Sequence, residues 1–491
     1  MADAPTTPSS SLTSRAVHGA AWTLPTSLGS RAVGLAGTIL LARYLAPAEY
    51  GEVSAAAILI TTASSVTTFG VGIYLVSKRD VSRADAFHAT CWFLVTGVAA
   101  IAAALAFRRP LGAWAGVPSL ERFMPIFAVS TLLERVAYLP EKMLVRRLQF
   151  RRLSLARAFG ELTFTGVSVT LAALGLGAMA IAYGTLARST LRFVAVVSAI
   201  DRREWLEPHR LRLATMSKIV GYGMNVSLAA IASFGMRRWD NLLVSRYFGP
   251  GVMANYNYAY NLADTPAVAV GEQMSDVIAA SFPHIEGEKR KAALVRSCTM
   301  ISMIMFPLAF GLSVVAPTVT RALFDERWAS VGSMLIFLAV LSASRPIADI
   351  LVAYFYACER PRVAVWLEWL SLVALIAAIS TVGRLGIYWT CTAVGGVFAL
   401  RALAAMWAAR RYDGIPLARF LIPMARPLAA CLAMALAIVG TRPALPGLSP
   451  GTQLVFEVAL GAITYFGVVL IVARSAAREA FMLVRSAVSR R

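Results

Sequence analysis

Acidic residues are scarce in this chain of 491 residues. Asp and Glu number 26 against 47 Lys and Arg, which leaves a formal net charge of +21. Such an excess can indicate nucleic-acid binding, but hydrophobic residues make up 58% of the chain. In a membrane protein with several spans, basic residues collect in cytoplasmic loops and set the orientation of the chain. We therefore expect membrane lipid around this protein and no nucleic-acid partner.

Cysteine, histidine and catalytic motifs are also scarce. The five cysteines include no C-x-x-C pair and the four histidines are isolated, so no metal site is expected. The sequence lacks the phosphate-binding loop G-x-x-x-x-G-K-[ST], the zinc-protease motif H-E-x-x-H and the hydrolase motif G-x-S-x-G. No loop between apolar segments is long enough for a catalytic domain. We expect neither enzymatic activity nor a cofactor.

Long apolar stretches follow one another along most of the chain. About 18 apolar residues suffice to span a bilayer as a helix, and lipid offers no partners for unpaired backbone groups. The pattern predicts an all-α polytopic membrane protein with about 14 transmembrane helices. The predicted spans are Val17–Leu41, Val53–Val76, Ala89–Phe107, Arg122–Met143, Leu153–Leu176, Ala178–Ile200, Ile219–Val244, Val252–Phe282, Ala292–Pro317, Val331–Cys358, Val363–Val382, Ile387–Ala409, Pro427–Gly440 and Leu454–Ala473.

The distribution of basic residues predicts the orientation. With the N-terminus inside, far more Lys and Arg fall in the predicted inner segments than in the outer loops. A missed or extra span would reverse the assignment of inner and outer loops in the rest of the chain and would disturb this charge pattern. We therefore expect an even number of spans and two cytoplasmic termini.

An internal repeat predicts two lobes. LLARYLAP (Leu40–Pro47) and LVSRYFGP (Leu243–Pro250) share Leu, Arg, Tyr and Pro at the same positions. A weaker echo relates Ile126-Phe127…Arg135 to Ile336-Phe337…Arg345. Six spans separate the two copies of the repeat, so both run in the same direction, as in transporters built from parallel repeats. We predict two parallel six-helix lobes around a central cavity, plus two C-terminal helices.

The expected organisation of the chain follows from the spans and the repeat. The segments are a cytoplasmic tail (1–16), an N-lobe with spans 1–6 (17–200), a cytoplasmic linker (201–215), a C-lobe with spans 7–12 (216–411), spans 13 and 14 (412–473) and a basic cytoplasmic tail (474–491).

Charged residues within the predicted spans are the candidates for function, because they are costly in lipid and usually face a bundle interior or a wet cavity. Cations dominate the deep positions, and an unmatched cationic patch would suit a phosphate, which Arg binds with two parallel hydrogen bonds. The candidate phosphate ligands are Arg31, Arg188, Arg192, Arg237 and Arg238.

Several of these charges also have structural interpretations. Asp349 lies one turn from Arg345 and can pair with it within one helix. Residues nearer the span ends can extend to the membrane surface; these are Glu161, Glu368, Arg401 and Glu457. Glu134 and Arg135 could form an interlobe or interhelix pair.

The run NYNYAYN (Asn255–Asn261) opens the eighth span. Aromatic faces interleaved with amides suit sugar rings, which makes Asn255, Tyr256 and Asn257 candidate sugar ligands. The alternative is an interfacial aromatic belt with Asn capping the backbone. Asp264 follows beside Pro266 and is either an ion-coupling site or a partner for a buried Arg.

Three stretches resemble the Wzx-type polysaccharide flippases of the multidrug/oligosaccharidyl-lipid/polysaccharide exporter superfamily. They are LARYLAPAEYG after the first span, MLVRRLQFRRLSLAR after the fourth, and RRWDNLLVSRYFGPGVMANYNYAYNLADTP across the seventh and eighth. The resemblance covers most of Arg15–Arg411. It assigns Arg31 by depth, and Arg237, Arg238, Asp240 and Asn241 by local motif.

The resemblance implies a function. The chain would flip undecaprenyl-diphosphate-linked oligosaccharides from the cytoplasmic to the periplasmic leaflet of the bacterial inner membrane, by ion-coupled alternating access. Asp240, Asp264 and Glu134 are the candidate ion-coupling residues. A polysaccharide polymerase and chain-length proteins are the possible protein partners.

Two other functions remain as alternatives. A drug or cation antiporter of the same superfamily would need a net acidic cavity, whereas the deep charges here are mainly Arg. A polysaccharide polymerase or glycosyltransferase would need a large periplasmic loop, and the longest outer loop, about Arg108–Glu121, is short.

Overall fold

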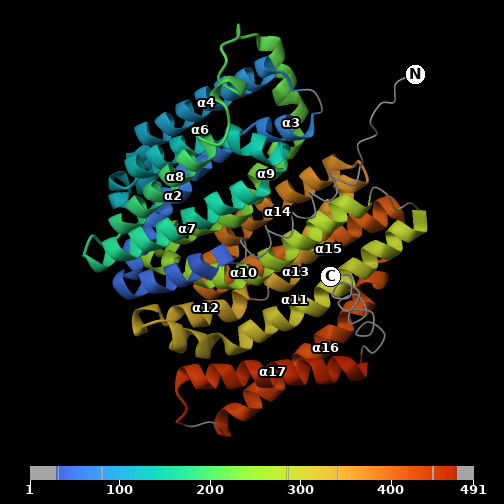
Figure 1. The fold of residues 1–491 in the computed structure, drawn as a ribbon. Helices are drawn as coiled ribbons and strands as arrows, with labels where there is room; N and C mark the ends of the chain where they lie inside the picture. Colours follow the sequence, from blue (N-terminus) through green and yellow to red (C-terminus); the bar gives the residue numbers. More distant parts are fainter. Residues whose placement is uncertain are drawn as a thin grey trace, which may run out of the picture. The chain divides into compact units, whose positions relative to one another are not determined.

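The computed structural model describes residues 29–30, 32–78, 81–282, 285, 287–339, 341–444 and 447–472. All regular secondary structure in these ranges is helical (Figure 1). Among these described residues, eight helices are long and apolar enough to cross a membrane, or ten if each of two bent pairs counts as one span. An all-α membrane protein with many spans is therefore confirmed, while fourteen remains a prediction. Arg31 and the two predicted cytoplasmic tails lie outside the described residues.

The chain divides into two compact units, Met1–Phe234 and Gly235–Arg491. In unit 1 a short apolar helix, Ala32–Tyr44, precedes seven helices. They are α2 (Pro47–Val66), α3 (Val71–Ser77), α4 (Arg83–Ala106), α5 (Arg108–Ala115), α6 (Met124–Arg146), α7 (Phe150–Ala173) and α8 (Met179–Val197). Helix α6 packs against α2, α4 and α8, and α7 runs beside α8 (Figure 1).

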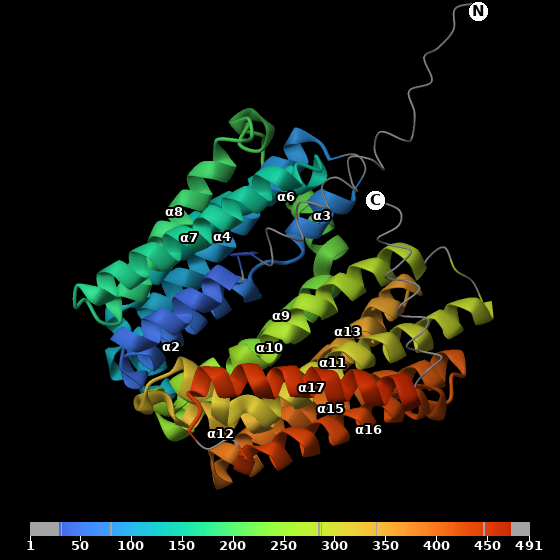
Figure 2. The same ribbon diagram turned by 60° about the horizontal axis from the view of Figure 1, so that its bottom comes forward.

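In the described residues, unit 2 contains the second part of one helix and eight further helices. They are the second part of α9 (Leu213–Phe248), then α10 (Pro250–Ser281), α11 (Gly287–Leu323), α12 (Ser330–Leu338), α13 (Leu341–Ala357), α14 (Pro361–Thr381), α15 (Ile387–Asp413), α16 (Leu417–Thr441) and α17 (Pro450–Val472). Helices α10, α11 and α15 pack around α13, and α17 lies beside α16 in both views (Figure 1 and Figure 2).

Helix α16 begins ten residues before the short span predicted at Pro427–Gly440. Two prolines, Pro423 and Pro427, lie inside it. Proline is tolerated within membrane helices, where neighbouring groups can satisfy the freed backbone carbonyls. The apolar helix is therefore longer at its N-terminal end than the predicted span.

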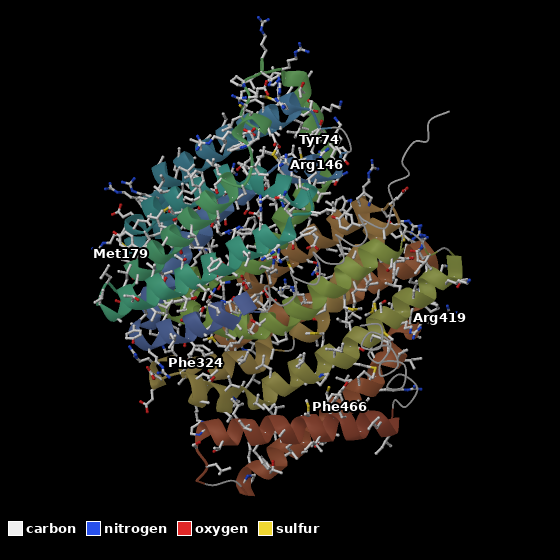
Figure 3. The ribbon with its side chains drawn as sticks, viewed as in Figure 1. Tyr74, Arg146, Met179, Phe324, Arg419 and Phe466 are labelled. Atoms are coloured by element: carbon white, nitrogen blue, oxygen red, sulfur yellow. The ribbon has the colours of Figure 1, made fainter. Side chains whose placement is uncertain are left out.

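The two units divide within α9 and not at the predicted 201–215 linker. The first part of α9 packs on unit 1, where Tyr222 meets Tyr74 of α3 edge-on with ring centroids 5.5 Å apart. Figure 3 labels Tyr74 beside Arg146 of α6, whose guanidinium donates to the carbonyl of Leu75 at 3.0 Å. The linker and the start of α9 therefore belong structurally to unit 1.

The sequence repeat forms the same local structure once in each unit. In unit 1 the helix Ala32–Tyr44 ends and α2 begins at Pro47. In unit 2, α9 ends at Phe248 and α10 begins at Pro250. Proline is favoured in the first turn of a helix because its fixed φ fits and no N–H bond is lost there. The shared residues therefore build a helix-to-helix turn.

Helix α3 meets α9 through two glycines. Gly70, with φ +66°, separates α2 from α3 at a bend of 56°. A Cβ atom added to Gly223 would lie 2.5 Å from the Cα of Gly70, so the two backbones touch. A methyl group at this crossing has to push the helices apart.

This contact predicts different effects for two neighbouring glycines of α9. Gly223→Ala should lower the free energy of unfolding by about 1–3 kcal/mol, the usual cost of overpacking. Gly221→Ala is the control, because nothing lies within 4 Å of its added Cβ and alanine favours a helix. Thermal unfolding of the purified variants in detergent measures both. Equal melting temperatures would contradict the glycine crossing.

Candidate functional site

The Arg pair of α8 is matched by acids of α6 and α7 in unit 1. Arg188 Nη1 lies 3.3 Å from Glu161 Oε1. Arg192 contacts Glu141 at 3.1 Å and Glu134 at 3.9 Å. The predicted phosphate ligands Arg188 and Arg192 are therefore paired in this structure, and Glu134 faces Arg192 and not its neighbour Arg135.

A polar cavity of about 150 Å³ opens beside these ion pairs. Glu134 and Arg188 line it, and Glu134 Oε1 accepts a hydrogen bond from Ser189 Oγ at 2.9 Å. The remaining polar lining is hydroxyl groups, from Thr38, Tyr50, Ser54, Thr61, Ser130, Thr131 and Thr185. The cavity therefore combines one carboxylate, one guanidinium group and several hydroxyl groups.

A second cluster, which we call the charge ladder, crosses four helices of unit 2. It comprises Asp264 of α10, Arg345 and Asp349 of α13, Arg401 of α15 and Glu368 of α14. Arg345 pairs with Asp264, and its Nε lies 3.8 Å from Asp349. Arg401 contacts Asp349 at 3.1 Å and Glu368 at 2.5 Å. Acids and guanidinium groups thus alternate along the ladder.

The charge ladder corrects two sequence-based interpretations. Glu368 and Arg401 are each 5% exposed and pair with each other, so neither extends to the membrane surface. Glu457 is likewise buried and contacts Arg442 at 3.0 Å. The predicted pair Arg345–Asp349 is present but is one contact in a longer chain. The sequence missed the ladder because its members come from four separate helices.

Asp240 lies in a closed hydrogen-bond network between α9 and α10. Its carboxylate accepts bonds from Tyr256 Oη at 2.7 Å and from the backbone and side-chain N–H groups of Asn241 at 2.8 and 2.9 Å. Asn257 donates to Asn241, and Asn261 to Asn257, both at 2.8 Å. The predicted sugar ligands Tyr256 and Asn257 are buried within this network, where they join two helices.

Asn255 is also buried, and its side-chain amide donates to the carbonyl of Gly251 at 3.0 Å. This backbone bond matches the alternative interpretation, in which Asn caps the backbone. The amide oxygen Oδ1 has no hydrogen-bond partner among the described residues.

Arg237 and Arg238 differ from the other deep arginines. Arg237 is half-buried and Arg238 is exposed. Neither has a carboxylate oxygen within 4 Å among the described residues, although Arg237 interacts electrostatically with Glu368, and Arg238 with Asp240. Of the predicted phosphate ligands that the structure describes, these two keep guanidinium groups free for a ligand.

Arg135 of α6 is a buried cation whose role the sequence did not predict. It is 2% exposed and lies over the ring of Phe93 at 4.3 Å. Its guanidinium bonds to Ser64 and Thr67 at the end of α2 and to the carbonyl of Phe93. It therefore joins α2, α4 and α6 at the point where α2 breaks, through uncharged partners.

The charge ladder makes a prediction about stability. Arg401→Met should lower the free energy of unfolding by about 3–5 kcal/mol, because it leaves Glu368 buried without its partner. Adding Glu368→Gln should recover part of this loss. The control Arg109→Met removes an exposed ion pair and should cost at most about 1 kcal/mol. Chemical unfolding in detergent measures all three, and equal losses for Arg401→Met and Arg109→Met would contradict the ladder.

Comparison with known proteins gives the family. A family described as "Polysaccharide biosynthesis protein" matches residues 40–333. The chain is 23% identical to the succinoglycan biosynthesis transport protein ExoT of Rhizobium meliloti, over 95% of this chain and 94% of that protein. It is 21% identical to the lipopolysaccharide biosynthesis protein WzxC of Escherichia coli, over 70% and 71% of the two chains.

Solved structures show the same fold. The lipid II flippase MurJ, in an inward closed conformation, matches with a TM-score of 0.76 and 16% identity over 92% of this chain and 98% of its own. An inward-facing multidrug transporter of the MATE family matches with a TM-score of 0.64 and 16% identity over 78% and 95%. The chain therefore belongs to the polysaccharide biosynthesis protein family.

Proposed function

We propose that this protein flips undecaprenyl-diphosphate-linked oligosaccharides from the cytoplasmic to the periplasmic leaflet of a bacterial inner membrane, for assembly of a surface or exported polysaccharide. The observation that carries the proposal is the match to ExoT, a polysaccharide transport protein, along nearly the whole of both chains. The fold of a lipid II flippase supports it. Both termini would be cytoplasmic, and a polymerase and chain-length proteins would receive the product.

Arg237 and Arg238 are our candidates for contact with the diphosphate. They are adjacent on α9 and free of carboxylates within 4 Å in the described part of the chain. A guanidinium group binds phosphate oxygens through paired, charge-assisted hydrogen bonds. Arg188 and Arg192 would have to leave their acids before they could bind substrate. Asn241, Asn255, Tyr256 and Asn257 would contact sugars only if the Asp240 network opened.

A drug or cation antiporter remains the second candidate. The MATE-like fold favours it, as does the charge ladder, in which three carboxylates accompany two guanidinium groups. A gene deletion distinguishes the two functions, because lipid-linked oligosaccharides would accumulate without a flippase and drugs or cations would accumulate without an antiporter.

Deletion of the gene should trap undecaprenyl-linked repeat units on the cytoplasmic leaflet and remove the polysaccharide. Wild-type protein should restore export, whereas Arg237→Ala, Arg238→Ala or the double variant should restore little, because the diphosphate loses its guanidinium contacts. Lys218→Ala is the control, since Lys218 is an exposed basic residue near the other end of α9. Mass spectrometry of lipid-linked sugars and a polysaccharide assay measure the outcome, with membrane level checked by immunoblot.

Normal polysaccharide in the deletion strain, together with increased drug sensitivity, would favour the antiporter. Full export by the double Arg variant would remove α9 from the proposed substrate site without affecting the flippase function.

For ion coupling we propose Glu134 first among the three candidates. Asp240 is enclosed by three hydrogen bonds and Asp264 is paired with Arg345. Glu134 lines a polar cavity and lies at the long distance of 3.9 Å from Arg192. A proton or cation could bind there without breaking a strong ion pair.

Glu134→Gln should abolish the stimulation of flipping by a proton or sodium gradient while basal exchange continues, because glutamine cannot bind and release a proton. Flipping of a fluorescent lipid-linked oligosaccharide in proteoliposomes with imposed gradients measures this. Glu161→Gln is the control, since Glu161 pairs with Arg188 but does not itself line the cavity. An unchanged gradient response in Glu134→Gln would leave Asp264→Asn as the next variant to measure.

A further inference from the structure

The segment 201–212, which connects α8 to α9, is tied to the first turns of α4. Trp205 is 1% exposed, and its carbonyl accepts a hydrogen bond from Thr90 Oγ1 at 3.2 Å. Arg83 of α4 pairs with Glu207 at 2.8 Å, and Arg147, directly after α6, pairs with Glu204. The segment is therefore held against unit 1 by hydrogen bonds and ion pairs.

His88 of α4 forms the last contact before α9 begins. It is 3% exposed. The backbone N–H of Arg212 donates to its Nε2 at 2.9 Å, and its Nδ1 lies 2.6 Å from the carbonyl of Ala84. A nitrogen that accepts a bond carries no proton, so the proton must be on Nδ1, which donates to Ala84. Both bonds exist together only in neutral histidine.

The partner of His88 occupies the start of α9. The backbone N–H groups of Thr215 and Met216 donate to the carbonyl of Arg212, so Arg212 precedes the first turn of the helix. The N-terminal end of a helix carries a partial positive charge. Protonated His88 would direct an N–H against the N–H of Arg212 and add a positive charge at this end. Protonation is therefore incompatible with the docked arrangement.

The neighbouring charged groups make contacts that do not depend on a neutral side chain in the same way. The hydrogen bond from Arg83 lowers the pKa of Glu207, so that pair stays ionised near neutral pH. Nδ1 of His209 lies 2.8 Å from the carbonyl of Glu207, a bond that neutral or protonated histidine can donate. The charged and titratable groups of this region are Lys78, Arg83, Asp85, Arg146, Arg147, Arg202, Arg203, Glu204, Glu207, His209, Arg210 and Arg212.

We propose that His88 is a pH-sensitive latch, which holds segment 201–212 and the start of α9 on unit 1 when neutral and releases them when protonated. The released state binds one proton more than the docked state. The docked state therefore loses stability relative to the released state as the pH falls. Histidine titrates between about pH 5 and 8, so the latch would respond to acidification of the water on the linker side of the membrane.

Hydrogen–deuterium exchange of the full-length protein in lipid nanodiscs tests the latch at pH 7.5 and 5.5. After correction for intrinsic exchange rates, peptides covering 201–216 should gain up to about tenfold in opening per pH unit, as expected for one proton. His88→Gln should abolish this gain, because an amide can accept from Arg212 and donate to Ala84 at either pH. His88→Lys, with a permanent charge, should be open at both.

His209→Gln is the matched control and should keep the wild-type response. Peptides from α11 should exchange alike in every variant, which establishes that unit 2 is folded. A pH response that survives in His88→Gln, or that disappears in His209→Gln, would overturn the proposal. Wild-type protection that is equal at both pH values would also overturn it, even if no His88 variant folds.

Discussion

A charge buried among helices has to be met by other charges or by hydrogen-bonding groups, because neither lipid nor an apolar core can solvate it. This constraint explains why the deep arginines of this protein are distributed as they are. The charge ladder joins α10, α13, α14 and α15, and the pairs of Arg188 and Arg192 join α8 to α6 and α7. In the described part of the chain these paired charges therefore join helices, and Arg237 and Arg238, with no carboxylate oxygen within 4 Å, are our candidates for substrate contact.

The two units satisfy this constraint in different ways. Arg135 and Arg345 occupy matching places in the weak sequence echo, and both are buried. Arg135 is held by hydroxyl and carbonyl groups at the break in α2, whereas Arg345 is held by Asp264 and Asp349. An Arg with neutral partners contributes to the fold without adding a titratable group. An Arg with carboxylate partners leaves acids whose protonation can change the pairing.

Much of the fold could be predicted from the sequence, because span length and hydrophobicity respond directly to the membrane. The repeated turn at Pro47 and Pro250 was also readable, since proline at a helix start has a local cause. The pairing of buried charges was harder to predict from the sequence. The pair Arg345–Asp349 could be predicted because the two residues lie one turn apart on one helix. Glu368 and Arg401 lie on different helices and meet only through the packing of α14 on α15. The Asn and Tyr residues after Gly251 resembled a sugar site because the sequence does not show that Tyr256 donates to Asp240 and Asn257 to Asn241, both on α9.

Helix α9 has a consequence that comes from its length alone. At 36 residues it is about 54 Å long, against a hydrocarbon core of about 30 Å. Even a strongly tilted helix of this length has to project into the aqueous phase. The span predicted at Ile219–Val244 would place the Arg212 end, with Trp205 and His88 around it, beyond the acyl chains, and Asp240 within them. One continuous rod would thus have one end in water and the other among lipids, so that a soluble protein or a change in proton concentration could act on it without entering the membrane.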